Sequence, residues 1–265
     1  MLQRLQASQQ YAAHIKQVVL DRTLEEQLLV DQQSGRPILV IHWDAMDQSK
    51  WSVPRHKNCN SKTFQTYDRP RLRVMGVWLH FFDLRLFILD PRLHAGGSAV
   101  VECASRAIED LVLQCQQKGV EVPSELCVWS DNTVKENKNQ TVLSWMQWLV
   151  SRQKFKSCSL SCAITGHTHN ALDQVYGLLA TAFRYVTDLS DPHDVVQQIS
   201  TLTGRLNLSA WLGADCRVTA TYVKSIWNWR DWHLDTIRII HPISHISNIQ
   251  CFFLVLTLQP PCIFL

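Results

Sequence analysis

The stretch Ile38-Leu39-Val40-Ile41-His42-Trp43-Asp44 decides the fold that this sequence predicts. Its large, mostly apolar side chains run without a turn signal and end at an acid, which is typical of a buried strand. On the N-terminal side, Ser34-Gly35-Arg36-Pro37 is a stop signal for a preceding helix. Residues 1–33 carry apolar side chains at near-helical spacing among polar ones, so they predict an exposed helix that ends just before the strand.

Downstream of this strand, apolar runs and helical stripes follow in an order that indicates the fold class. The predicted elements are strands at 72–82 and 84–89, a helix at 98–118, a strand at 126–129, a helix at 140–152, a strand at 159–164 and a helix at 171–185. Three strands before any helix indicate an antiparallel meander, and the later alternation indicates parallel strands joined by right-handed crossovers. Among common α/β folds, this order matches the ribonuclease H-like fold, a mixed five-stranded sheet with helices on both faces.

The chain divides into four predicted parts. They are an N-terminal helix (1–33), a ribonuclease H-like core (36–190), a helical, Trp-rich extension (191–238) and an irregular apolar tail (239–265). The tail is short for a membrane span and contains Pro260-Pro261, so we expect no membrane association. Nine cysteines without a regular framework, and an N-terminus without an apolar signal core, predict an intracellular protein of the nucleus or cytoplasm.

Basic side chains concentrate in one part of an otherwise nearly neutral chain, whose formal net charge is +3. Between residues 50 and 73, seven cations accompany a single acid. The cations are Lys50, Arg55, Lys57, Lys62, Arg69, Arg71 and Arg73. Trp51, Phe64 and Tyr67 lie among them. Because cations follow phosphates and aromatic rings stack on bases, the stretch predicts contact with nucleic acid near Asp44, with a solvated loop as the alternative.

Three aspartates follow predicted strands or open the helix after one. Asp44 ends the first strand, Asp131 ends the fourth, and Asp173 opens the helix after the fifth. Glu102, early in the first core helix, is a fourth candidate. Sites in open α/β sheets form outside the carboxyl ends of parallel strands, so we expect these acids to converge. Clustered carboxylates raise one another's pKa unless cations neutralise them, and their hard oxygen atoms suit Mg²⁺ or Mn²⁺.

Such a cluster predicts metal-dependent cleavage of phosphodiesters, because two divalent ions activate water and stabilise the leaving oxygen. In this interpretation Asp44, Asp131 and Asp173 ligate metal, and Glu102 assists them. The alternative interpretation is structural: Asp44 and Asp131 cap turns after their strands, as aspartate often does.

A second chemical signal is Gly166-His167-Thr168-His169, directly after the last predicted core strand. The run resembles the metal-binding ending of calcineurin-like metallophosphoesterases. Other motifs of that family are absent, since Asp44 has no His two residues later and the chain contains no Gly-Asn-His. In a nuclease, His167 or His169 would lie near the scissile phosphate or help to position the leaving group. They are also candidate ligands of a phosphoesterase, or hydrogen-bonding residues at a helix boundary.

Three motifs together resemble a eukaryotic domain family that has no assigned function and often occurs in a transposon-derived context. They are Asp44-Ala45-Met46-Asp47-Gln48, Ser130-Asp131-Asn132-Thr133 and Gly166-His167-Thr168-His169 with Asp173-Gln174 after it. The likeness covers roughly residues 10–235. This chain departs from the family pattern at Ala45, where Gly is usual, and before Asp173, which is the last acid of the family's Glu-Asp-Ile-Asp and the only one kept here.

The resemblance and the strand order both imply a link to the ribonuclease H-like superfamily, which includes transposases and integrases. The function we expect is therefore a transposon-derived nuclease or strand transferase that depends on Mg²⁺ or Mn²⁺ and binds nucleic acid. One alternative is a non-catalytic, domesticated or degenerate copy that binds nucleic acid or protein. Another is a calcineurin-like metallophosphoesterase.

Overall fold

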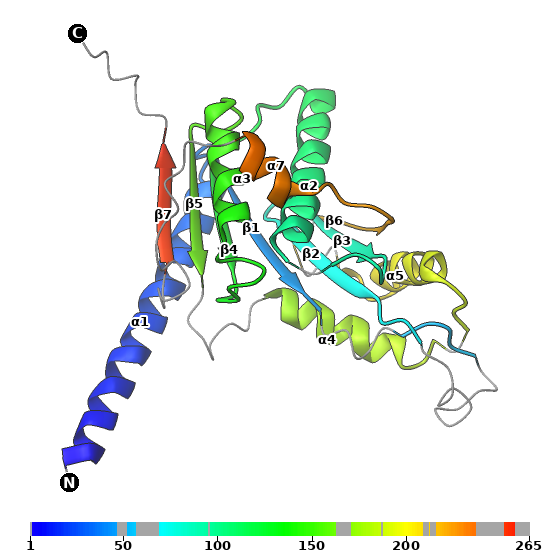
Figure 1. The fold of residues 1–265 in the computed structure, drawn as a ribbon, viewed down its shortest axis with the longest axis horizontal. Coiled ribbons are helices and arrows are strands. Elements are labelled where there is room, and N and C mark those ends of the chain that lie inside the picture. Colours follow the sequence, from blue (N-terminus) through cyan, green and yellow to red (C-terminus); the bar gives the residue numbers. More distant parts are fainter. Residues whose placement is uncertain are drawn as a thin grey trace.

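The structure is a computed structural model that describes residues 2–46, 52–56, 69–94, 96–162, 171–186, 188–208, 212, 216–236 and 252–257 (Figure 1). The helices are α1 (Leu2–Gln33), α2 (Gly97–Lys118), α3 (Gln140–Ser151), α4 (Ala171–Phe183), α5 (Pro192–Arg205) and α7 (Trp229–Thr236). The strands are β1 (Ile38–Ala45), β2 (Arg73–Leu79), β3 (Asp83–Leu89), β4 (Glu125–Ser130), β5 (Ser157–Cys162), β6 (Arg217–Val223) and β7 (Phe252–Thr257). Within these ranges, no helix combines the length and the apolar character that crossing a membrane requires.

The strands form one mixed sheet of seven strands, in the order β6-β3-β2-β1-β4-β5-β7. β2 is antiparallel to both β1 and β3, whereas β4 is parallel to both β1 and β5. The α/β class, the antiparallel meander and the later parallel strands are therefore confirmed. Because β1 and β4 are parallel neighbours, their carboxyl ends meet at the same edge of the sheet, where Asp44 and Asp131 lie.

The two outer strands differ from the sequence prediction, and the sheet is larger than the predicted five strands. β6 pairs in parallel with β3, and β7 pairs antiparallel with β5. For these segments the sequence predicted a helical extension and an irregular tail. Each added strand satisfies main-chain hydrogen-bonding groups that β3 or β5 would otherwise leave open at the edge, which explains the difference.

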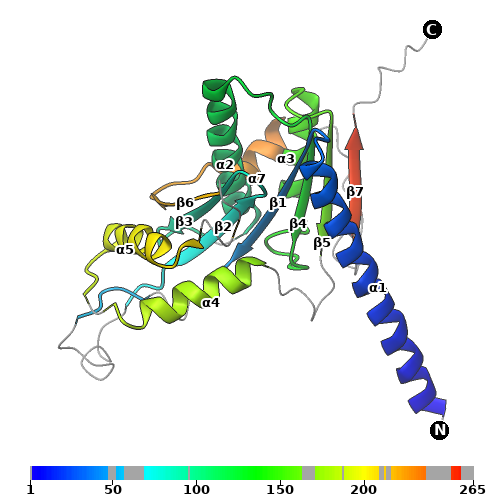
Figure 2. The same ribbon diagram turned by 180° about the vertical axis from the view of Figure 1, so that it is seen from behind.

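Helices cover both faces of the sheet, as predicted. In Figure 1, α2, α3 and α7 lie in front of the sheet, where alternate residues of β1 such as Leu39, Ile41 and Trp43 share one core with α2 and α3. α7 packs on α2 and α3. Figure 2 shows the other face, where α4 and α5 pack mainly on β2, β3 and β6. Alternate side chains of a strand point to opposite faces, so a strand buried on both sides reads as a continuous apolar run.

Capping residues position the helices near the site. α2 ends at Gly119, whose φ of 65° is left-handed, so the predicted glycine stop is confirmed. Its first helical residue is Gly97 rather than a residue after Ser98, and the Ser98 hydroxyl instead accepts a hydrogen bond from the Arg230 N–H at 3.3 Å. α3 begins after Asn139, whose side chain accepts a hydrogen bond from the Val142 N–H at 3.1 Å.

The C-terminal half of α1 lies on the sheet, whereas its N-terminal part extends away from it in both views (Figures 1 and 2). Gln32 donates a hydrogen bond to the His80 carbonyl at 2.9 Å, and its side-chain oxygen accepts one from the Val40 N–H at 3.2 Å. Glu25 lies 3.1 Å from Nε2 of the buried His42. The predicted N-terminal helix is thus attached to the core through its last turns.

Candidate acidic site

Asp44 lies at the carboxyl end of β1, opposite Gly76 of β2. Burial raises the pKa of the Asp44 carboxyl from its usual 3.8 to about 7. A hydrogen bond from the Ala45 N–H at 2.7 Å acts in the opposite direction. The charges of Asp131, Asp173 and Glu136 add to the rise in pKa, so these three acids lie close enough to Asp44 to repel its negative charge. We call Asp44, Asp131, Glu136 and Asp173 the acidic cluster.

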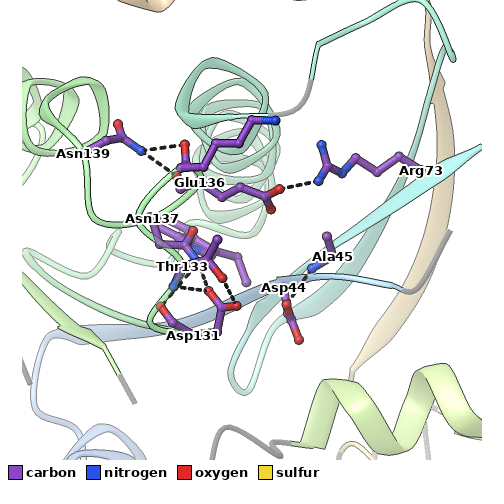
Figure 3. Close-up of polar contacts among 10 residues, drawn as sticks. Asp44, Ala45, Arg73, Asp131, Thr133, Glu136, Asn137 and Asn139 are labelled. Atoms are coloured by element: carbon purple, nitrogen blue, oxygen red, sulfur yellow. Dashed lines mark hydrogen bonds and ion pairs between the residues drawn. The ribbon is translucent and has the colours of Figure 1, made fainter. Parts of the chain in front are cut away.

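Asp131 follows β4 directly and is held by its own loop (Figure 3). One carboxylate oxygen accepts hydrogen bonds from the Thr133 N–H, at 3.1 Å, and from the Asn137 amide. The other oxygen accepts a hydrogen bond from the Thr133 hydroxyl. The turn-capping role that the sequence offered as an alternative is therefore real for Asp131, and it fixes the direction of the carboxylate.

Asn137 fastens this loop to β1. Its side-chain oxygen accepts a hydrogen bond from the Trp43 indole N–H at 2.9 Å, while its amide nitrogen donates to Asp131. Asn137 is buried, so each of these polar groups is satisfied inside the protein. Trp43 precedes Asp44 in the strand, and Asn137 therefore connects the two aspartates through neighbouring residues.

Glu136 is the residue of the cluster that the sequence analysis did not select. Its carboxylate forms an ion pair with Arg73 of β2, and both side chains are mostly buried. Arg73, which the sequence offered as a nucleic-acid contact, is thus engaged within the protein. Glu136 stands in the polar run Glu136-Asn137-Lys138-Asn139. The local pattern of this run does not distinguish an acid of a functional site from an acid in a solvated loop.

Asp173 is in the first turn of α4, and Tyr176 attaches that helix to β1. The Tyr176 hydroxyl donates a hydrogen bond to the Asp44 carbonyl at 2.6 Å. Tyr176 and Asp173 are three residues apart in the helix, so they lie on neighbouring parts of its surface. The expectation that Asp173 comes near Asp44 agrees with its effect on the Asp44 pKa.

Glu102, the acid predicted to assist the three aspartates, is engaged by Arg106 and by the segment that leads into α7. Its carboxylate accepts hydrogen bonds from Arg106 and from the Trp229 indole, both at 2.8 Å, and from the Trp227 N–H at 3.3 Å. α7 packs on α2, and the hydrogen bond between Trp229 and Glu102 joins the two helices. This contact depends on residues more than a hundred positions later in the chain.

In the comparison with protein families, the family described as Domain of unknown function (DUF7869) matches residues 66–259. The chain belongs to this family. The matched region contains Asp131, Glu136 and Asp173 but starts after Asp44. It also includes β6 and β7, so most of the segment predicted as an irregular tail lies within the DUF7869 region. Neither the curated proteins nor the solved structures give a significant match.

The basic residues predicted to contact nucleic acid differ in their surroundings in this DUF7869 chain. Lys50, Lys57 and Lys62 lie outside the described residues, as do His167 and His169. Arg55 donates hydrogen bonds to the carbonyl oxygens of Phe183, at 3.2 Å, and Ser52, at 3.3 Å, and burial lowers its pKa. Its role here is to join its loop to the end of α4. Arg71 is exposed, and Arg69 is half-buried.

The acidic cluster offers oxygen ligands but no complete metal cage. Within the described ranges, no three His, Cys, Asp or Glu side chains form a group that could hold a metal ion. Mg²⁺ is commonly bound by one or two carboxylates together with water and substrate phosphates, so a pair such as Asp44 and Asp131 has a suitable donor set. The acidic cluster of this DUF7869 chain therefore suits a metal ion whose ligands come partly from a substrate. It suits less well a metal ion that is ligated by protein side chains alone.

Proposed function

We propose that this DUF7869 domain is a divalent-metal-dependent nuclease or strand transferase that acts on the phosphodiesters of nucleic acids. The observation that carries the proposal is the half-buried Asp44 carboxylate at the end of β1, whose pKa is raised to about 7 by burial and by three neighbouring acids. Carboxylates are brought together at such a cost mainly where a cation is to be bound or a proton moved.

The strand order supports the same class of function. Within the larger sheet, β3-β2-β1-β4-β5 has the order and directions that we expect of a ribonuclease H-like sheet. Asp44 lies at the carboxyl end of β1, Asp131 follows β4, and Asp173 is in the first turn of the helix after β5. In an open α/β sheet, sites form at the carboxyl ends of the strands. A transposon-derived origin remains part of the proposal, and it rests on the motif resemblance alone.

We assign the roles as follows. Asp44 and Asp131 would hold Mg²⁺ or Mn²⁺, with Asp173 near them, and the ion would supply an activated water and neutralise charge on the phosphate. The Asn137 and Thr133 hydrogen bonds keep the Asp131 carboxylate in one orientation. Near neutral pH Asp44 carries a proton part of the time, which metal binding would release. His167 and His169 are proposed to lie near the scissile phosphate.

Cleavage of labelled single-stranded and duplex DNA and RNA, with Mg²⁺, with Mn²⁺ and with EDTA, tests the proposal. Replacing Asp44 or Asp131 with Asn should lower metal-dependent cleavage by about 100-fold or more. Glu109→Gln changes an exposed acid of α2 and serves as the control. Glu102→Gln should also leave cleavage intact, because Glu102 lies against α7. Unchanged cleavage in the Asp131→Asn protein would refute the proposal.

A second candidate function is non-catalytic binding of nucleic acid or protein. It is favoured by one observation, namely that Asp131 is satisfied by Thr133 and Asn137 and that Glu136 is paired with Arg73. Its signature would be nucleic-acid binding that ignores Mg²⁺ and survives the Asp44→Asn change. The metallophosphoesterase alternative depends on His167 and His169, and hydrolysis of a phosphomonoester such as p-nitrophenyl phosphate would favour it.

A further inference from the structure

The loop between β6 and α7 presents a large aromatic side chain to solvent. Trp227 is 63% exposed, whereas Trp148, Trp229 and Trp232 form an edge-to-face cluster with ring centroids 5.3–6.4 Å apart. Packing accounts for these three indoles, because each covers part of another. The Trp227 ring, by contrast, keeps most of its apolar surface in contact with water.

The main chain around Trp227 is firmly held. The Trp227 N–H donates to Glu102 at 3.3 Å, and Glu102 also accepts the Trp229 indole N–H at 2.8 Å. Two residues earlier, the Ser225 carbonyl accepts a hydrogen bond from Arg106 at 3.2 Å. The loop is thus fixed to α2 on either side of the exposed ring, and the indole is presented from a defined position.

Two exposed cations lie close to Trp227 in the sequence. Lys224 is three residues before it and Arg230 three residues after it. The Lys224 ammonium lies 5.8 Å from the centroid of the Tyr222 ring of β6. The nearby acid Asp231 accepts a hydrogen bond from the Asn228 amide at 2.6 Å. A solvent-exposed indole between two cations has the features that bind single-stranded nucleic acid, since the ring stacks on a base and the cations follow the phosphates.

The first turn of α2 connects this loop to the acidic cluster. On one side, the Ser98 hydroxyl accepts a hydrogen bond from the Arg230 N–H at 3.3 Å. On the other side, Gly97 lies so close to Asn139 that a Cβ atom would meet the Asn139 side chain. Asn139 in turn donates a hydrogen bond to the Glu136 carbonyl at 2.9 Å. Both the segment that follows Trp227 and the loop that carries Glu136 therefore contact the first turn of α2.

We propose that Trp227, flanked by Lys224 and Arg230, stacks on an unpaired base of a single-stranded nucleic acid whose strand continues towards the acidic cluster. The direction of the strand rests on the proposed function, whereas the stacking does not require cleavage. The substrate class that follows is an unpaired strand or strand end rather than an intact duplex, because bases inside a duplex offer no free face for stacking.

Binding in EDTA tests this inference without any cleavage. Fluorescence anisotropy of a labelled oligothymidylate, compared with a duplex that contains it, should show tighter binding of the single strand. Trp227→Ala should weaken single-strand binding roughly 5- to 100-fold, and Trp227→Phe should retain most of the affinity. Tyr11→Ala is the matched control, because Tyr11 is a similarly exposed aromatic residue (67%) on α1. Thermal unfolding establishes that each variant is folded.

The charged residues give an independent readout. Arg230→Ala should lower the dependence of log affinity on log salt concentration by about 0.7, the value for one single-strand phosphate. Equal affinity of the wild-type and Trp227→Ala proteins, or preference for the duplex, would overturn the inference even if the acidic cluster cleaves DNA. Single-strand binding that needs Trp227, in a protein without metal-dependent cleavage, would support the inference and reject the nuclease.

Discussion

Gly76 gives Tyr176 the space to reach the main chain of Asp44. The two strands place Gly76 directly opposite Asp44, and the Tyr176 hydroxyl donates to the Asp44 carbonyl at 2.6 Å. A Cβ atom at position 76 would overlap that hydroxyl. A glycine in the middle of a strand usually weakens it, so this position is explained by the close approach of α4 rather than by the strand itself.

The first prediction concerns that contact. Gly76→Ala should destabilise the protein by about 1–3 kcal/mol, because the added methyl group displaces a buried side chain. Gly177→Ala is a matched control within α4: nothing lies near its Cβ position, so the change should stabilise the helix by about 0.5–1 kcal/mol. Urea unfolding of both variants measures the difference. Equal stability of the Gly76→Ala and wild-type proteins would contradict the contact.

Tyr176→Phe tests the hydrogen bond separately from the packing. The ring remains and the hydroxyl is lost, so the free energy of unfolding should fall by about 1–2 kcal/mol. If Tyr176 positions Asp44 and Asp173 for the proposed chemistry, the pH profile of cleavage should also move, because the environment of Asp44 changes. A stability loss without any change in the pH profile would assign Tyr176 a purely structural role.

The Asp44 pKa predicts how stability depends on pH. In the folded protein this pKa is about 7, against 3.8 for an ordinary aspartate, so the folded state binds the proton more tightly than the unfolded state. The stabilisation is complete below the unfolded value and is lost as the pH rises through about 7. Asp44→Asn should therefore be more stable than the wild type by about 1–3 kcal/mol near pH 8 in EDTA. Saturating Mg²⁺ should reduce this advantage if Asp44 binds the ion.

The buried pair His42 and His80 predicts that the protein loses stability at acidic pH. His42 Nδ1 lies 2.5 Å from His80 Nε2, and burial, followed by the neighbouring His42, lowers the His80 pKa well below its usual 6.5. Glu25 of α1 is the acid that faces His42, at 3.1 Å. The folded state disfavours protonated His80, so stability should fall as the pH drops below about 6.5.

Hydrogen exchange locates that effect. Protection of the α1 amides near Glu25 should decrease on acidification, because protonation of His80 places a desolvated charge in the buried pair on which α1 lies. The decrease should be smaller in His80→Gln, which keeps a hydrogen-bonding side chain without a titratable ring. An identical acid response in the variant would assign the effect to other residues.

Local sequence patterns were sufficient for the central strands and for the acids that follow them. The short apolar run before Asp44 is typical of a buried strand, and the alternating order that follows predicts Asp131 after a parallel strand, which is the neighbour of β1. The outer strands were missed because β6 and β7 are stabilised by pairing with β3 and β5, which lie far from them in the sequence. Their own residues do not specify that partner.

Sequence alone thus determined the α/β class and the positions of Asp44, Asp131 and Asp173, because hydrophobic periodicity and strand order are local properties. Only the tertiary structure decided which other acid joins them. Glu136, whose charge adds to the rise in the Asp44 pKa, forms an ion pair with Arg73, whereas the Glu102 carboxylate accepts a hydrogen bond from Trp229 of α7. Both outcomes depend on contacts between distant segments, and no spacing within a single segment encodes such contacts.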